Sequence, residues 1–188
     1  FEPLAAGSHV FRIIDGEAQP AHAIAGVTTT PLSAKLEDGS FARALRLQGD
    51  DDTIGALNTA FLTNGFHLAF ADGTELAVPL EVQTIAHREG HSRLAFNIGK
   101  GVKATIIDRQ LGGDAFVSSV SHLMVGDGAE IVWIIDQERG EGAVHLGQFN
   151  AELGKDAKLT LFIMNSGSAL ARQEVVVKSA GEGSYFTL

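Results

Sequence analysis

The histidines are the first residues whose types and spacing could support chemistry. The segment His87-Arg88-Glu89-Gly90-His91 places two histidines four residues apart, as in zinc sites of the His-Glu-x-x-His type. That site needs a helix, which brings both imidazoles to one face, and a glutamate directly after the first histidine. Here the glutamate comes one place later, Gly90 disfavours a helix, and strand patterns flank the segment. We therefore interpret the segment as a solvated turn.

Two further pairs could carry chemistry if neighbouring strands bring them together. His122 and His145 lie inside expected strands, where they could share a metal ion or a proton, or could be hydrogen-bonded structural histidines. Asp108 and Asp136 lie near the expected ends of their strands. They could pair like the acids of polysaccharide-cleaving β-helices, or they could cap turns.

Nucleotide-binding motifs are absent or lack their required context. Gly99-Lys100-Gly101-Val102-Lys103-Ala104 has the letters of a dinucleotide fingerprint, which works only where a strand leads into a helix. A strand pattern follows it, so we interpret these glycines as a corner. The chain has no P-loop, and we expect no ATP hydrolysis by the chain itself. It also has no Gly-x-Ser-x-Gly, and the segment 165–168 suits a loop.

The corner pattern recurs along the chain. Corner positions 73, 101, 128, 156 and 183 are 28, 27, 28 and 27 residues apart. Three residues after each corner comes an apolar residue, and a charge precedes it in the first four copies: Glu75, Lys103, Glu130 and Lys158. Trp133 and the phenylalanines at 96, 116, 149 and 162 suit packing positions. A period of this length predicts stacked strand units, that is, an all-β solenoid.

Composition narrows the class of protein. The 188 residues carry a formal net charge of −9, which argues against a nucleic-acid partner. There is no cysteine, which excludes disulfides and thiolate-bound metals or clusters and fits a cytoplasmic protein. No apolar run is long enough to predict a membrane span, and no signal peptide is recognisable at the N-terminus. Phe1 at the start and an open pattern after Ser184 indicate a fragment, and we expect end-to-end association through that open end.

Two segments are expected along the chain. Residues 1–50 form an N-terminal segment with one strand at 10–14, closed by Asp15-Gly16, and short helices broken by Asp38-Gly39. Residues 51–188 form the solenoid core, which begins with a helix after Asp50-Asp51-Asp52. Ile54, Leu57, Ala60 and Phe61 mark the expected buried face of this helix, and Asn64-Gly65 marks its expected end.

Several blocks resemble the SufB/SufD family, the scaffold subunits of the SUF system of iron–sulfur cluster assembly. The most specific ones are Leu57-Asn58-Thr59-Ala60-Phe61, Asn64-Gly65, Ala71-Asp72-Gly73 and Val78-Pro79-Leu80. The Gly-x-Gly strands, the stretch Ser118–His122 and Ala180-Gly181-Glu182-Gly183 are similar to the same core. The resemblance covers roughly residues 10–188, and the strand and turn at 10–16 look more like SufD than SufB.

The resemblance implies a right-handed parallel β-helix and a non-enzymatic scaffold. Its expected partners are a SufB-like sister subunit and a SufC-like ATPase in a SufBCD-type complex, with a homodimer as a further option. The family's docking and cluster-handling regions lie in later rungs and a C-terminal helical region, so we assign no catalytic, cofactor or metal-ligating residue here. The alternative is a β-helix enzyme acting on carbohydrate or acyl groups, which a groove lined by His122, His145 and carboxylates would favour.

Overall fold

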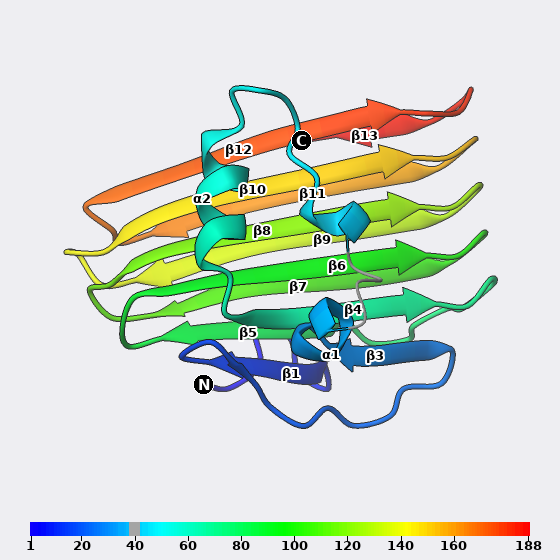
Figure 1. Ribbon diagram of the computed structural model, residues 1–188. Coiled ribbons are helices and arrows are strands. Elements are labelled where there is room, and N and C mark those ends of the chain that lie inside the picture. Colours follow the sequence, from blue (N-terminus) through cyan, green and yellow to red (C-terminus); the bar gives the residue numbers. More distant parts are fainter. Residues whose placement is uncertain (38–41) are drawn as a thin grey trace.

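From β4 onward successive strands alternate between two sheets, and within each sheet they stack mainly in parallel (Figure 1). The computed structural model describes residues 1–37 and 42–188. The seven-stranded sheet has the order β13-β11-β9-β7-β5-β1-β2, and the six-stranded sheet has the order β12-β10-β8-β6-β4-β3. This arrangement confirms the predicted parallel β-solenoid.

The strand bounds agree closely with the pattern of the sequence. The seven-stranded sheet contains β1 (His9–Ile14), β2 (Glu17–Ala18), β5 (Leu80–Ala86), β7 (Lys103–Gly112), β9 (Glu130–Arg139), β11 (Lys158–Ser166) and β13 (Tyr185–Thr187). The six-stranded sheet contains β3 (Val27–Pro31), β4 (Asn64–Phe70), β6 (Gly90–Ile98), β8 (Phe116–Val125), β10 (Val144–Leu153) and β12 (Leu170–Ser179).

The N-terminal residues join both sheets. β1 pairs in parallel with β5, while β3 pairs antiparallel with β4. The helical pieces α1 (Leu32–Glu37), η1 (Ala42–Leu45) and α2 (Thr53–Phe61) come between β3 and β4. Strands on both sides of residue 50 therefore share the same two sheets, and the division of the chain at that residue stays a prediction. The predicted break at Asp38-Gly39 lies outside the described residues.

The five predicted corners all adopt the left-handed backbone region. φ is +69° at Gly73, +63° at Gly101, +67° at Gly128, +56° at Asp156 and +70° at Gly183. The glycine two places before a corner has a different role. A Cβ at Gly126 would lie 2.7 Å from the backbone carbon of Gly99 in the rung below. The repeated Gly-x-Gly thus combines a close approach between rungs with a left-handed turn.

Side chains between the sheets form one continuous apolar core. Ala104, Ile131 and Leu159, each three residues after a corner, are buried in it, and Leu76 and Phe186 pack against it. Trp133 lies at its centre, edge-on to Phe96 and Phe149. Phe162, in contrast, is exposed, so the predicted packing role is wrong for that residue.

The four charged residues that directly precede these core positions form a ladder on the outer face of the seven-stranded sheet. Glu75 lies opposite Lys103, Lys103 opposite Glu130, and Glu130 opposite Lys158. The Lys158 ammonium lies 3.2 Å from the Glu130 carboxylate. The signs therefore alternate from rung to rung along the stack.

The helix α2 differs from its prediction in the face that it buries. Asp52 caps it through a hydrogen bond from Gly55 N, as expected for an acid at this position. Its buried residues are Ile54, Gly55 and Asn58, whereas Phe61 is 61% exposed. The predicted stop at Asn64-Gly65 is also wrong, because the helix ends at Phe61 and both residues belong to β4. Within the described part of the chain, no helix is long and apolar enough to cross a membrane.

We predict that Gly128→Ala lowers the free energy of unfolding by about 1 kcal/mol, because a Cβ disfavours the left-handed region. The site has no heavy atom within 4 Å of the added Cβ, so the cost comes from the backbone alone. Gly113→Ala is the matched control, since that Cβ also meets open space while φ lies outside the left-handed range. Urea unfolding of the two variants measures the difference, and equal stabilities would contradict the corner argument.

Candidate functional site

The interior of the solenoid is polar where β7 and β9 end and β8 and β10 begin. Residues two apart on a strand face the same side. Asp108 and Gln110 therefore face inward with Ile106, and Arg139 faces inward with Ile135. The sheet opposite contributes further inward side chains, namely Ser119 and Ser121 from β8 and His145 from β10. We call this group the interior polar cluster.

The hydrogen bonds of the cluster form two separate halves, one around Asp108 and one around Arg139. Asp108 accepts from Ser121 Oγ at 2.9 Å and from Gln110 Nε2 at 3.2 Å. Arg139 donates to the Leu111 carbonyl at 2.8 Å and through Nε to His145 Nδ1 at 3.3 Å. His145 Nδ1 is thus an acceptor, which leaves the proton of the neutral ring on Nε2.

This tautomer decides what the cluster can do chemically. His145 Nε2 lies 2.9 Å from Ser119 Oγ and carries the proton, so it donates to the hydroxyl and cannot remove its proton. Both side chains are buried. The pair therefore resembles a nucleophile and base in composition only, and it belongs to the half of the cluster that contains Arg139.

Burial shifts the pKa values of all three titratable groups. It raises the pKa of Asp108 to about 6, against hydrogen bonds from Ser121 and Gln110 and the charge of Arg139. Burial lowers the pKa of Arg139 to about 10, against the charge of Asp108. Burial and then the charge of Arg139 lower the pKa of His145 to about 3. At neutral pH the cluster holds a neutral imidazole, a largely ionised Asp108 and a charged Arg139.

The structure does not bring His122 and His145 together. His122 lies next to the core residue Leu123 on its strand and so points to the outer face, whereas His145 shares the inward face of Phe149. Their strands also place His122 opposite Asn150 rather than His145. The shared metal or proton role considered for this pair is therefore wrong.

Asp108 and Asp136 lie on opposite faces in the same way. Asp108 is opposite Ile135 and faces inward, while Asp136 is opposite Arg109 and faces outward. Both lie within strands and neither caps a turn. Neither alternative for this pair is correct.

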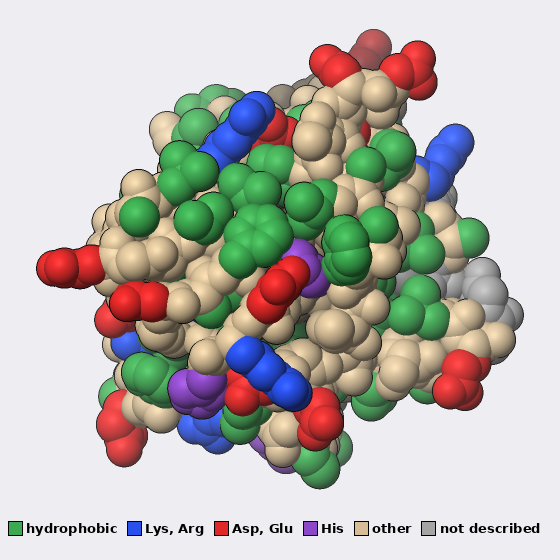
Figure 2. Space-filling model, turned by 60° about the vertical axis from the view of Figure 1, so that its left-hand side comes forward, with side chains coloured by type: hydrophobic (Ala, Val, Ile, Leu, Met, Phe, Trp, Pro, Cys, Tyr) green, Lys and Arg blue, Asp and Glu red, His purple; other side chains and the backbone are tan. Residues whose placement is uncertain are grey.

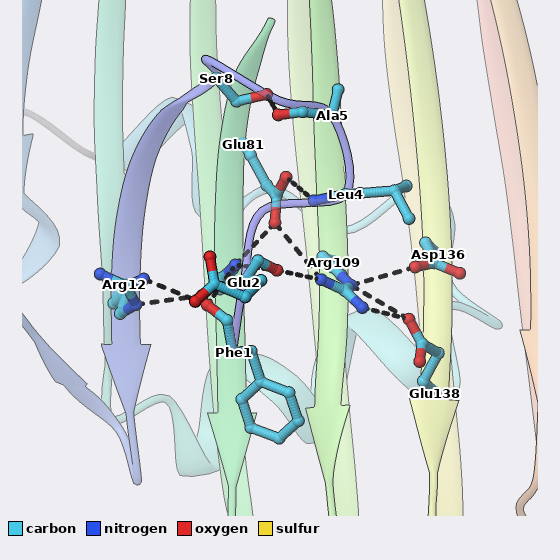
Figure 3. A network of polar contacts seen from close by, with 11 residues as sticks. Phe1, Glu2, Leu4, Ala5, Ser8, Arg12, Glu81, Arg109, Asp136 and Glu138 are labelled. Atoms are coloured by element: carbon cyan, nitrogen blue, oxygen red, sulfur yellow. Dashed lines mark hydrogen bonds and ion pairs between the residues drawn. The ribbon is translucent and has the colours of Figure 1, made fainter.

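Arg109 is the centre of a polar network on the outer face of the seven-stranded sheet (Figure 3). Its guanidinium contacts Glu138 at 2.7 Å, Asp136 at 3.2 Å and the buried Glu81 at 3.8 Å. It also donates to the Glu2 carbonyl at 2.7 Å. These contacts tie the first residues of the chain across β5 and β7.

The carboxylates of this network differ in their pKa values. Burial and the neighbouring Glu138 raise the pKa of Asp136 to about 6, against Arg109. Hydrogen bonds from Arg109 and then Asp136 lower the pKa of Glu138. On acidification Asp136 therefore takes up a proton before Glu138, the more exposed of the two.

The two histidines of the 87–91 segment also differ in their exposure and in their contacts. His87 is exposed and its Nδ1 lies 3.1 Å from the Asp15 carboxylate. His91 is buried, with Nδ1 2.8 Å from Ser118 Oγ and Nε2 3.4 Å from Glu89. The expected turn holds for the first part of the segment, while Gly90 and His91 begin β6.

Ser118, His91 and Glu89 have the order of a hydrolytic triad, but their surroundings give them another role. Ser118 is 1% exposed, and its hydroxyl accepts a hydrogen bond from Asn58 of α2 at 3.0 Å. Since α2 contacts β8 here, a substrate cannot reach the hydroxyl. Ser118 and His91 instead hold α2 on the sheet, through Asn58 and the ring of Phe61.

Asn58 and Arg93 complete the attachment of α2. Asn58 donates to the Ser92 carbonyl at 3.0 Å, and its Oδ1 accepts from Arg93 Nε at 3.0 Å. Arg93 also donates to Thr59 Oγ1 at 3.0 Å. Burial lowers the pKa of Arg93 to about 10, against the charge of Asp52. Sequence reasoning missed this polar interface because it assigned the apolar face of α2 to the core.

Apolar side chains gather on the outer face of the six-stranded sheet, where its strands begin, and Figure 2 shows several of them together. Phe116, Val144 and Leu170 lie opposite one another on β8, β10 and β12. The rings of Phe61 and Phe116 both contact His91. We call Phe61, Phe116, Val144 and Leu170 the apolar surface.

A comparison with protein families identifies the solenoid. Residues 82–188, more than half of the chain, match the SufBD core domain of the SUF system for iron–sulfur cluster assembly. The chain belongs to this family. A comparison with curated proteins finds no match. The SufBD core match begins within β5 and includes every later rung, while the resemblance of residues 10–81 stays a prediction.

We predict that Asn58→Ala lowers the free energy of unfolding by about 2–3 kcal/mol. The substitution removes the acceptor of the buried Arg93 guanidinium and the donor to Ser118. Ala60→Ser, on the exposed side of the same helix, should change it by less than about 0.5 kcal/mol. Chemical denaturation compares the two, and a similar small effect of both would show that α2 is held by other contacts.

The interior polar cluster predicts opposite pH dependences for two variants. The raised pKa of Asp108 gives stability that is present below its unfolded pKa of about 3.8 and lost as pH rises through about 6. The lowered pKa of His145 gives stability that is present above about 6.5 and lost as pH falls toward 3. Between pH 4.5 and 6.5 the two contributions oppose each other.

We therefore expect Asp108→Asn to lose stability more steeply than the wild type on acidification from pH 6.5 to 4.5, by about 1 kcal/mol per pH unit. His145→Gln should change the slope in the opposite direction. Urea unfolding at stepped pH measures both slopes, with the exposed Asp50→Asn as control. Wild-type slopes in both cluster variants would refute the assignment.

Proposed function

We propose that the chain is the β-helix part of a SufD-type, non-catalytic scaffold subunit in iron–sulfur cluster assembly. The observation that carries the proposal is the match of the stacked rungs to the SufBD core domain. The SufD assignment rests on the strand and turn at 10–16. There Asp15 and Gly16 have φ of +49° and +85°, and they connect β1 to β2 as a tight hairpin.

The arrangement of polar groups supports a scaffold. The interior polar cluster is enclosed between the sheets, and Ser118 is covered by α2. The 188 residues contain no cysteine, so none of them can accept sulfur or ligate a cluster as a thiolate. In this proposal the solenoid carries out no reaction itself. It presents rigid outer faces that hold its partners in fixed positions.

We propose as partners a SufB-like sister β-helix and a SufC-like ATPase in the cytoplasm. The apolar surface supports a role in protein contacts, since clustered exposed apolar side chains are typical of interaction sites. Self-association is a further proposal. It rests on the same apolar surface, which a second copy of the chain can cover.

Co-purification tests the function. The full reading frame carries the tag and is expressed with its SufB-like and SufC-like companions, and the mass of the eluted species is measured. We expect a stable complex that contains both companions, and no ATP hydrolysis by the tagged subunit alone. Elution of the subunit without either companion, or ATP hydrolysis by it alone, would contradict the proposal. A mass of two subunits in the absence of companions would support self-association.

A further inference from the structure

Two histidines meet at the end of the solenoid formed by β1, β2 and β3. His9 begins β1, and His22 lies in the connection between β2 and β3. His9 Nδ1 and His22 Nε2 are 3.0 Å apart, with ring centroids 5.2 Å apart and planes inclined by 44°. Phe11 packs edge-on against His22 at 5.2 Å. The family match begins at residue 82 and does not reach this pair.

The two nitrogens share a hydrogen bond in which the tautomers decide which ring donates, and their separation is also that of neighbouring ligands on one metal ion. Imidazole nitrogens bind zinc at about 2.0–2.1 Å. Two such nitrogens at 90–109° around one ion are about 2.9–3.4 Å apart, and the observed 3.0 Å falls within this range. Each neutral imidazole has one nitrogen with a lone pair; with the protons on His9 Nε2 and His22 Nδ1, both lone pairs face the space between the rings, and rotation of the exposed His22 ring directs them to a common point. His22 is exposed and His9 half-buried, so an ion can approach from solvent.

We propose that His9 and His22 form a two-histidine site for a borderline divalent transition-metal ion such as Zn²⁺ or Ni²⁺. Imidazole is a preferred ligand of these ions. No third histidine or acid of the described residues completes a ligand set, so water or an external ligand occupies the remaining positions. A hollow of about 490 Å³, lined by His22, Pro20, Thr29 and Phe66 among others, lies beside His22 and gives such a ligand room.

The proposed site joins two segments of the terminal rung. His22 is two residues before Ile24, which packs in the same core as Phe11. An ion held by both histidines closes a loop between positions 13 residues apart. Closing this loop restricts the unfolded chain, so the ion stabilises the folded end of the solenoid.

Calorimetric titration of the full chain with Ni²⁺ and with Zn²⁺, in a buffer that does not bind metals, tests the site. We expect one ion per chain, and at least about a tenfold loss of affinity in each of His9→Gln and His22→Gln. His87→Gln is the matched control, because His87 is also exposed and also lies beside a potential ligand, Asp15. The control should bind as the wild type does, and an equal loss in it would overturn the assignment.

A second measurement does not depend on variants. Paramagnetic Ni²⁺ added in small amounts should broaden the ring resonances of His9 and His22 before those of the other histidines. Earlier broadening at His87 or His67 would place the ion elsewhere and overturn the proposal.

The unfolding temperature should also rise with Zn²⁺ in the wild type and in His87→Gln but not in His9→Gln. A rise of the same size in His9→Gln would refute the link between the two segments.

Discussion

Backbone hydrogen bonds between the corners of successive rungs set the spacing on which the whole stack depends. Gly73 N donates to Lys100 O, Gly101 N to Asp127 O, and Gly128 N to Lys155 O, at 2.8–2.9 Å. These bonds require a left-handed corner and a close approach of backbone to backbone in the same short segment. Because β7, β9, β11 and β13 each begin two residues after such a corner, a distortion at one corner would shift the register of the strand that follows it.

Along the strands, the interior between the two sheets has an apolar half and a polar half. The half next to the corners is filled by large apolar side chains around Trp133, whereas the far half holds the interior polar cluster. Burial of Asp108, Arg139 and His145 is costly unless each group is hydrogen-bonded or paired. Their contacts across the two sheets meet that need, so the cluster specifies how the sheets face each other in a way that apolar packing alone does not.

The fold was predictable from the sequence because it rests on a repeated local pattern. Corner spacing and alternation identified nearly all of the strands and the five corners of the stack, including the one at Asp156. The side of the sheet to which each of these two histidines, His122 and His145, points could in principle also be predicted from the sequence. Counting by twos from Leu123 and from Phe149 places His122 and His145 on opposite sides of the same sheet. That count needs the inward residues to be known, and the sequence alone offers several candidates on each strand.

The candidate sites were less predictable, because they depend on contacts between distant parts of the chain. Asn58 and Arg93 are 35 residues apart, and no local period connects them. The helical pattern of α2 indicated an apolar face, but tertiary hydrogen bonds decided which side is buried. The contact of His9 with His22 depends likewise on the path of the connection between β2 and β3, for which the sequence shows only a weak pattern.

The alternating ladder of Glu75, Lys103, Glu130 and Lys158 limits how such a stack can change its length. Removal of a single rung from within it would place two glutamates or two lysines opposite each other on neighbouring strands. Like charges in that position are unfavourable, although the cost at an exposed site is small. Removal or duplication of two neighbouring rungs keeps the signs in order. The electrostatic repeat of this solenoid is therefore twice as long as its structural repeat, and a pair of rungs is the unit by which it can grow or shrink without conflict.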